Sequence, residues 1–127
     1  VKKNYFKNKI KCTCKIFFNN LPDIMFESQF VISRSGASTL SEITALGKPT
    51  ILIPYKFAKN NHQEKNAKWL VNKGAGIMLL EDELTVENLK DKIITFIKNK
   101  KKLKKMSKNS FSLGDSKSLL KLSRLIF

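Results

Sequence analysis

Short apolar runs alternate with segments of helical spacing along the chain, and this alternation predicts strands separated by helices. The apolar run at residues 30–33 predicts a short strand. The continuously apolar run at residues 50–54 is typical of a strand buried on both faces of a sheet, and the run at residues 76–80 predicts another buried strand. A further run at residues 10–18 alternates roughly between apolar and polar residues and is rich in β-formers. It therefore predicts a strand ahead of the others.

The segments between and after these runs have the spacing of helices. A short helix is predicted at residues 21–26, where Pro22 takes an early helical position at which its missing N–H costs least. Longer helices are predicted at residues 40–46 and 62–72. Thr85 is expected to cap another helix, whose apolar face consists of Val86, Leu89, Ile93, Phe96 and Ile97.

Glycines mark the ends of predicted helices, and no hairpin signal appears. Gly47 is expected to end one helix in a left-handed conformation, and Gly74 is expected to end the next. A lysine-rich helix near residue 100 and, after Gly114, an amphipathic segment to residue 127 complete the chain. Strands that alternate with helices through short loops predict an α/β fold, a Rossmann-like parallel sheet with helices on both faces.

The length of 127 residues suits one domain with one hydrophobic core and is too small for two. No apolar run approaches the roughly 20 residues that span a bilayer, and no signal-peptide pattern follows the first residue. The sequence begins at Val1 rather than at Met. We therefore expect residues 1–127 to be a single cytoplasmic domain and a fragment of a longer protein.

Positive charge gathers near both ends of the chain, and the formal net charge is +15. Such a field attracts polyanions, including nucleic acid and anionic lipid headgroups. A bias toward Lys, Asn and Ile, which A/T-rich codons encode, offers a compositional explanation. Arginine, which base recognition favours, occurs only twice and argues against sequence-specific DNA binding. The clustered lysines are Lys2, Lys3, Lys7, Lys9, Lys11, Lys15, Lys98, Lys100, Lys101, Lys102, Lys104, Lys105 and Lys108.

The sequence offers few residues for a metal site. Cys12 and Cys14 are the only cysteines and His62 is the only histidine, whereas a structural zinc site uses four ligands. Residues two apart on a strand are poorly placed to form a disulfide. We expect two reduced thiols and no bound metal.

The segment S-R-S-G-A-S-T-L-S-E at residues 33–42 lies between a predicted strand and a helix, where parallel sheets bind ligands. Gly36 and Ala37 leave room for a ligand to approach the backbone, and the first helical turn offers N–H groups that suit a phosphate. Ser35, Ser38 and Thr39 add hydroxyl groups. No G-x-x-x-x-G-K-[ST] or G-x-G-x-x-G motif occurs, so ATPase and dinucleotide functions are disfavoured.

Glu42 has two explanations that the pattern alone supports equally. Thr39 and Glu42 have the spacing of a capping box, in which the carboxylate bonds back to the N–H of the cap residue. Alternatively, Glu42 contacts a ligand held by the preceding loop.

A second polar cluster follows the next predicted strand. His62, Gln63 and Asn66 carry donors and acceptors that suit sugar hydroxyls, although a solvated helix terminus would explain any one of them. Two helix starts at neighbouring strand ends, one suited to phosphate and one to hydroxyls, together predict a nucleotide-sugar pocket.

These motifs resemble the MurG family of bacterial glycosyltransferases. The resemblance rests on V-I-S-R-S-G-A-S-T-L-S-E at residues 31–42, G-K-P at 47–49, N-H-Q at 61–63 and N-A at 66–67. It covers only the C-terminal, donor-binding domain of the family. It implies the second half of a GT-B fold and a metal-independent transfer of N-acetylglucosamine from UDP-GlcNAc to undecaprenyl-pyrophosphoryl-MurNAc-pentapeptide in peptidoglycan synthesis. It also implies a peripheral location on the cytoplasmic face of the bacterial inner membrane.

The resemblance assigns the first cluster to the nucleotide. It implies that Ala37, Ser38 and Thr39 lie against the diphosphate and that Glu42 bonds the ribose hydroxyls. The residues leading into this loop are included in the implied UDP-GlcNAc site; they are Arg34, Ser35 and Gly36.

The resemblance also places residues around the sugar and the base. His62 and Gln63 would face the donor sugar, with Asn66 beside them. Phe17 and Phe18 match the family position beside the uracil. No catalytic residue is expected within this chain.

Two features of the family are absent from the sequence, namely the G-G-S-Q-G loop and the whole N-terminal acceptor domain. We therefore expect either a fragment of a transferase or a donor subunit that docks onto a separate acceptor-binding chain, inactive in isolation. The alternative function is a basic module without catalysis that binds nucleic acid or an anionic membrane. In a combined version, the lysines help to hold the complete enzyme at an anionic membrane surface, with no nucleic-acid partner.

Overall fold

The computed structural model describes residues 1–114, so the amphipathic segment predicted to reach residue 127 lies outside the described residues. Three parallel strands form the centre: β1 (Val31–Ser33), β2 (Thr50–Leu52) and β3 (Gly76–Met78). Their order in the sheet follows the sequence, with β2 between β1 and β3. Each strand lies within a predicted apolar run, and the predicted parallel sheet is confirmed.

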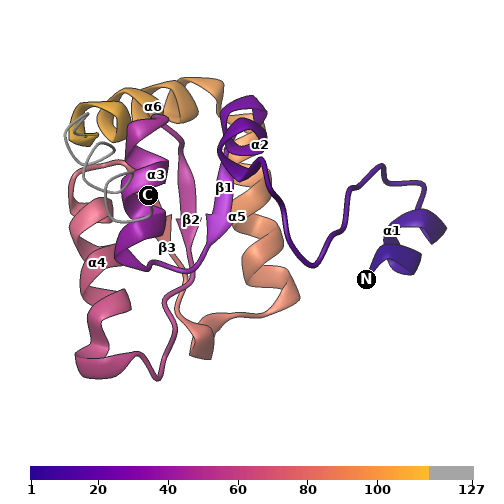
Figure 1. The fold of residues 1–127 in the computed structure, drawn as a ribbon, viewed down its shortest axis with the longest axis horizontal. Helices are drawn as coiled ribbons and strands as arrows, with labels where there is room; N and C mark the ends of the chain where they lie inside the picture. Colours follow the sequence, from indigo (N-terminus) through magenta and orange to yellow (C-terminus); the bar gives the residue numbers. More distant parts are fainter. Residues whose placement is uncertain (115–127) are drawn as a thin grey trace.

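Helices connect and cover the strands (Figure 1). α4 has the bounds predicted from the sequence, and Thr85 caps α5 by accepting a hydrogen bond from the amide of Asn88 at 3.1 Å. No helix within residues 1–114 is long and apolar enough to cross a membrane. The helices are α1 (Lys2–Lys7), α2 (Leu21–Glu27), α3 (Ala37–Ala45), α4 (His62–Asn72), α5 (Val86–Lys98) and α6 (Lys100–Leu113), with 3₁₀ turns η1 (Lys59–Asn61) and η2 (Glu81–Glu83).

The two faces of the sheet carry separate hydrophobic clusters. Leu52 packs with Ile43 of α3 and Leu70 of α4 on one face. Its neighbour Ile51 points the opposite way and packs with Phe96 of α5 and Met106 of α6. All three residues of β2 are buried, so this strand has no face turned to solvent. Full burial of a large apolar side chain stabilises a fold by about 1.5–3 kcal/mol. The predicted coverage of both faces is confirmed.

The strand predicted at residues 10–18 is wrong. This segment is extended but pairs with no strand, and it leads away from the sheet to α1 (Figure 1). Ile16 is fully exposed, and the side chain of Phe17 is 74% exposed. β-propensity stabilises a strand only when its backbone finds a partner and one face is buried, and neither condition holds within residues 1–114.

Gly47 closes α3 as predicted, and its conformation also explains why α6 can pack there. Its φ is +62°, in the left-handed region. A Cβ at this position would lie 3.0 Å from the Cβ of Phe111 on α6. The carbonyl of Gly47 accepts a hydrogen bond from Ser107 Oγ at 2.7 Å, which fixes α6 across the end of α3.

Candidate functional site

Two helices begin side by side at the carboxyl edge of the sheet. α3 follows β1 through residues 34–36, and α4 follows β2 through residues 53–61. β1 and β2 are adjacent and parallel, and α3 contacts α4. Both helix N-termini therefore lie at the edge where open parallel sheets bind ligands.

The start of α3 presents backbone amides without helical acceptors. Gly36 is its N-cap, and the Gly36 carbonyl accepts the first helical bond from the amide of Leu40 at 3.0 Å. The amides of Ala37, Ser38 and Thr39 precede that bond and have no partner within the helix. Ala37 and Ser38 are exposed, and a Cβ on Gly36 would meet nothing within 4 Å. An anion can approach these amides directly, and the positive end of the helix dipole favours it.

The capping box proposed for Thr39 and Glu42 is wrong. α3 begins at Ala37 rather than at residue 40, so Thr39 lies inside the helix and its side chain caps nothing. Glu42 therefore sits in the second turn, one turn after Ser38 and on the same side of the helix. The opposite side carries the buried residues Leu40 and Ile43. Glu42 is partly exposed, and capping does not explain its presence.

Ser35 joins the two helix starts to each other. Its side chain is completely buried, and its Oγ donates to the carbonyl of Gln63 in the first turn of α4 at 2.6 Å. In return, Asn66 Nδ2 donates to the carbonyl of Ser35 at 3.0 Å. These bonds hold the starts of α3 and α4 together, so the hydroxyl of Ser35 and the Nδ2 group of Asn66 are engaged within the protein.

Gln63 and His62 stand at the first turn of α4. Gln63 Oε1 accepts a hydrogen bond from the amide of Tyr55 at 2.9 Å, which ties the loop after β2 to the helix. Within residues 1–114, Gln63 Nε2 donates to no acceptor, so this amide retains a donor. His62 is exposed beside it.

Arg34 braces the same edge. One guanidinium nitrogen donates to the carbonyls of Ile53 and Pro54 at 3.2 and 3.3 Å and pairs with Glu81 of η2. The guanidinium carbon lies 5.7 Å from the ring centre of Tyr55. Arg34 thus links the ends of β1 and β2 with η2. Glu81 and Tyr55 had no signal in the sequence that would identify them, because their partner is distant along the chain.

The turn before α4 has an unusual backbone. Asn60 and Asn61 both have positive φ values, of 52° and 55°. Asparagine tolerates this left-handed conformation better than most residues, and the N-N dipeptide ahead of a helix is its signal in the sequence. Asn61 Nδ2 donates to Glu64 Oε2 at 3.1 Å, and Lys68 Nζ pairs with Glu64 at 2.7 Å. Lys68 and then Asn61 lower the pKa of Glu64, so its carboxylate stays charged below the usual range.

Phe17 and Phe18 are not brought together with the other predicted residues. They lie in the extended segment that leads away from the sheet (Figure 1), and Lys15 Nζ is 5.6 Å from the ring centre of Phe18. Residues 1–114 place Ser35, Gln63 and Asn66 in one hydrogen-bonded group, with the α3 amides beside it, whereas Arg34 bonds the neighbouring loop after β2 and η2.

The candidate site is an open edge rather than an enclosed cavity. A cavity of about 240 Å³ between α3 and α4 includes Ala37, Ser41 and Asn66 in its lining, and a smaller one of about 80 Å³ lies between Tyr55, Asn61 and η2. Neither is lined by Glu42. In the described part of the chain, no three His, Cys, Asp or Glu side chains gather in a way that could hold a metal ion.

Comparison with known proteins identifies similar sequences and a similar fold. Residues 1–122 match the model of the glycosyltransferase family 28 C-terminal domain. The UDP-N-acetylglucosamine–N-acetylmuramyl-(pentapeptide) pyrophosphoryl-undecaprenol N-acetylglucosamine transferase of Bacillus cytotoxicus is 49% identical over 100 residues, which cover 79% of this chain and 28% of that protein. The transferase of the same name from Desulforamulus reducens is 43% identical over 105 residues, covering 83% of this chain and 28% of the relative.

The fold is shared with a solved structure. The crystal structure of Acinetobacter baumannii MurG matches with a TM-score of 0.75 over 84% of this chain and 30% of that chain, at 24% sequence identity. The chain thus spans under a third of the length of the proteins it matches.

Proposed function

Because this chain belongs to the glycosyltransferase family 28 C-terminal domain family, we propose that it is the donor-binding part of an N-acetylglucosamine transferase of the MurG type. The parallel sheet, the helices on both faces and the similarity to MurG agree with half of a GT-B fold. Residues 1–127 form one C-terminal domain of a longer two-domain enzyme. The alternative of a basic module without catalysis is not favoured by these relatives.

The complete enzyme transfers N-acetylglucosamine from UDP-GlcNAc to undecaprenyl-pyrophosphoryl-MurNAc-pentapeptide during peptidoglycan synthesis. This chain supplies the donor half of the cleft. The acceptor half and the catalytic base belong to the remaining part of the enzyme or to a partner chain. The enzyme acts at the cytoplasmic face of the inner membrane as a peripheral protein, where its lipid-linked acceptor resides.

The start of α3 carries this proposal. The amides of Ala37, Ser38 and Thr39 point out of the helix end, and no side chain of Gly36 obstructs them. They hold the diphosphate of UDP-GlcNAc, whose leaving-group charge is stabilised by the helix dipole and by charged hydrogen bonds of about 1.5–3 kcal/mol each. The amides supply this stabilisation from the backbone, before any side chain moves.

The residues around this anion site have two roles: some bond the ligand, and others hold those residues in place. Glu42 accepts hydrogen bonds from the ribose hydroxyls, and His62 and Gln63 Nε2 bond the hydroxyls of the donor sugar. Arg34, Ser35 and Asn66 position these groups through the bonds that connect β1, β2 and α4.

Phe17 and Phe18 cover the uracil in the complete enzyme. This role requires residues 10–18 to approach the sheet. They could do so at β1, which is an edge strand and on which Ile32 is 41% exposed. An edge strand offers backbone groups to which another strand can pair. The exposed ring of Phe17 and the partly buried ring of Phe18 then have a surface to cover.

Replacement of Ser38 by Asp tests the anion site. A carboxylate at the second position of α3 is favourable to the helix but repels a diphosphate. Calorimetry of the folded chain with UDP is expected to show binding for the natural sequence and a loss of about ten-fold or more for Ser38→Asp. Val86→Asp is the matched control, because it places a carboxylate at the exposed start of α5. Unchanged UDP affinity in Ser38→Asp, or equal losses in both variants, would refute the proposed site.

A further inference from the structure

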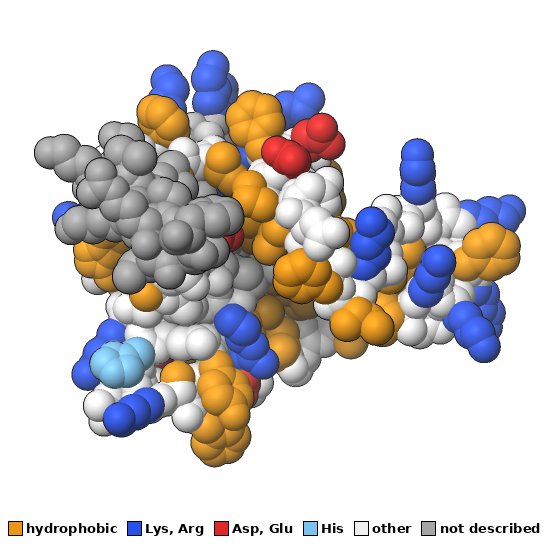
Figure 2. Space-filling model, viewed as in Figure 1, with side chains coloured by type: hydrophobic (Ala, Val, Ile, Leu, Met, Phe, Trp, Pro, Cys, Tyr) orange, Lys and Arg blue, Asp and Glu red, His pale blue; other side chains and the backbone are white. Residues whose placement is uncertain are grey.

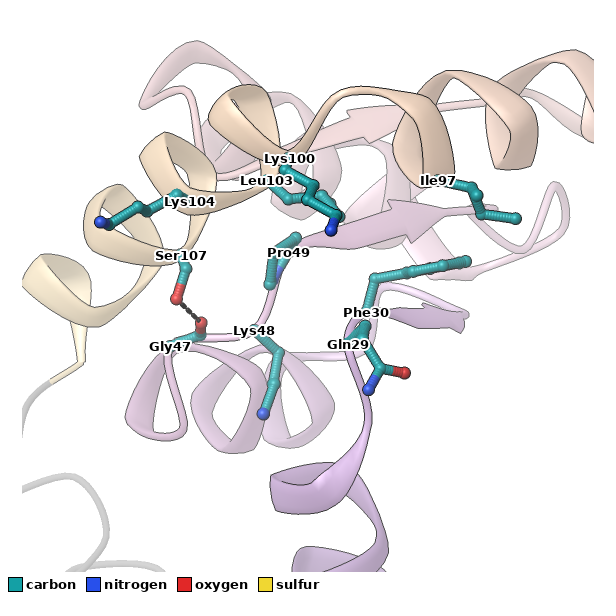
Figure 3. A pocket seen from close by; sticks show the side chains of 10 residues that line it. All are labelled: Gln29, Phe30, Gly47, Lys48, Pro49, Ile97, Lys100, Leu103, Lys104 and Ser107. Atoms are coloured by element: carbon teal, nitrogen blue, oxygen red, sulfur yellow. Dashed lines mark hydrogen bonds between the residues drawn. The ribbon is translucent and has the colours of Figure 1, made fainter.

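A large groove lies at the opposite edge of the sheet, away from the starts of α3 and α4. α6 crosses the amino ends of the strands there, and a cavity of about 620 Å³ opens between α6, the end of α5 and the segments that lead into β1 and β2 (Figure 3). Its walls include Phe30, Pro49, Ile97 and Leu103, so its floor is apolar. Lys48, Lys100 and Lys104 also line it.

α6 presents an unbalanced positive surface beside this groove. Met106 and Ser110 are its buried residues, so its lysines occupy the outward side of the helix. Figure 2 shows lysines projecting along the upper edge of the molecule, where α6 lies in Figure 1. The helix contains no acidic residue, and the ion pairs among the described residues involve none of its lysines. The lysines of α6 are Lys100, Lys101, Lys102, Lys104, Lys105 and Lys108.

Lys48 lines the groove, and its ammonium group is engaged by the end of α2. Its Nζ donates to the carbonyls of Phe26 and Ser28, the latter at 2.9 Å, and lies 5.4 Å from the ring centre of Phe26. These bonds direct the ammonium group toward the end of α2 and away from α6 (Figure 3).

Exposed apolar side chains lie among these lysines. Phe111 on α6 is 67% exposed, and Ile97 at the end of α5 is 62% exposed. Phe111 lies close in helical projection to Lys104 and Lys108, seven and three residues before it. A helix face that serves only for solubility gains nothing from large apolar groups. Lysines mixed with Phe, Ile and Leu are typical of surfaces that rest in the headgroup region of a membrane.

We propose that this surface, made of the α6 lysines and the groove below them, docks onto a bilayer of anionic phospholipids. The lysines meet the headgroup phosphates, and the groove with Ile97 and Phe111 takes up apolar surface from the lipids. Because the surface lies at the edge opposite the starts of α3 and α4, docking leaves the donor site open. The inference rests on the proposed location at a membrane, but not on donor binding.

Charge complementarity and the groove together favour lipid over nucleic acid. A nucleic acid would use the lysines but would leave the apolar groove unfilled. Its single strands are held by stacking on aromatic platforms, whereas α6 offers one exposed ring, Phe111. Lipids satisfy both parts of the surface.

Vesicle co-sedimentation of the full 127-residue chain tests the charged part. The probes are vesicles of phosphatidylcholine alone and of phosphatidylcholine with phosphatidylglycerol. The triple variant Lys100→Gln/Lys104→Gln/Lys108→Gln is expected to lose about 100-fold in partitioning to the anionic vesicles, since each lysine near such a surface contributes roughly five-fold. The matched control, Lys65→Gln/Lys73→Gln/Lys92→Gln, removes the same charge from α4, its end and α5, and is expected to retain most of the binding.

The apolar part is tested without changing charge. Ile97→Asn is expected to weaken binding to the anionic vesicles, whereas Val86→Asn, at the exposed other end of α5, is expected to leave it unchanged. Equal losses in the two lysine triples, binding by the α6 triple at the natural level, or insensitivity to Ile97→Asn would overturn the proposal. So would loss of duplex RNA binding in the α6 triple with vesicle binding intact. UDP calorimetry on each variant provides the control: a variant that binds UDP like the natural sequence is folded and has an intact donor site, whatever its binding to vesicles.

Discussion

The residue at which α3 begins decides between the two roles considered for Glu42, a capping box and a ligand contact. Since α3 starts at Ala37, the carboxylate cannot complete a capping box, and Glu42 is a partly exposed residue in the second turn that contributes little to stability. Glu42→Ala is therefore expected to change the free energy of unfolding by less than about 0.5 kcal/mol. If Glu42 bonds the ribose, UDP affinity falls by about ten-fold or more, the equivalent of 1.5–3 kcal/mol.

Urea unfolding and UDP calorimetry on the same Glu42→Ala sample separate these effects. A second titration with a UDP analogue that lacks the ribose hydroxyls provides the control, because the variant and the natural sequence should bind it equally. A variant that loses stability while it keeps its UDP affinity would return Glu42 to a structural role.

Ser35 has the opposite character, because its hydroxyl is buried and engaged. Ser35→Ala removes the hydroxyl donor to the carbonyl of Gln63, which keeps its bond within α4, and this is expected to cost about 0.5–1.5 kcal/mol in the free energy of unfolding. UDP affinity should also fall, since the starts of α3 and α4 are no longer held together. Ser41→Ala is the matched control on α3: its Oγ bonds only the local carbonyl of Ala37, at 3.1 Å, and its loss should cost less than about 0.5 kcal/mol.

Thermal unfolding with and without UDP measures both variants. If Ser35→Ala is as stable as Ser41→Ala, the buried bond to Gln63 does not stabilise the junction of the two helices. If Ser35→Ala loses stability but keeps its UDP affinity, the junction does not position the donor site.

At the scale of elements, the sequence predicted those strands and helices whose formation depends on neighbouring residues in the chain. β2 was recognisable because a strand covered on both faces reads as a continuous apolar run, and α4 was recognisable because a polar turn and Gly74 bound its apolar stripe. The start of α3 was missed because Thr39 and Glu42 imitate a capping box, whereas the chain continues the helix back to Gly36. The strand prediction for residues 10–18 was wrong for a different reason, since a strand forms only with a pairing partner, which the local sequence does not reveal.

The candidate site shows the same division. The positions of the α3 amides follow from the strand–loop–helix pattern, and so does the proximity of the two helix starts at one edge of the sheet. The sequence could not predict that three polar side chains donate to carbonyls far along the chain, namely those of Arg34, Ser35 and Asn66. Polar side chains beside a phosphate-suited loop look alike in sequence whether they contact a ligand or the neighbouring backbone.

The junction of α3 and α6 depends on Gly47. Gly47→Ala is expected to lower the free energy of unfolding by about 1–2 kcal/mol from the left-handed backbone alone, and further through the approach of its Cβ to Phe111. The double variant Gly47→Ala/Phe111→Ala should recover only a share of the second part. It removes the ring carbon 3.3 Å from the new Cβ, but it keeps the Cβ of residue 111 at 3.0 Å and leaves the backbone strain. Urea unfolding of both single variants and the double variant measures the two contributions. Full recovery would show that the contact, and not the conformation, requires glycine.

At the scale of the whole molecule, 25 basic residues face 10 acidic ones, and this imbalance opposes folding. The surface ion pairs contribute about 0–1 kcal/mol each and weaken with salt. Repulsion among the excess lysines also weakens with salt, and with a formal net charge of +15 it outweighs the pairs. Raising NaCl from about 0.01 to 0.15 M shortens the screening length from about 30 to 8 Å and is expected to raise the urea midpoint of unfolding.

The lysine triple of α6 provides the comparison for this salt effect. Lys100→Gln/Lys104→Gln/Lys108→Gln removes charge from the most crowded stretch, so its urea midpoint at low salt should exceed that of the natural sequence and should rise less when salt is added. Such a gain in stability, obtained by removing exposed lysines, would mean that the α6 charges are kept at a cost to the fold. A salt-induced fall of the midpoint in the natural sequence would instead show that the ion pairs dominate, and the excess charge would then carry no such cost.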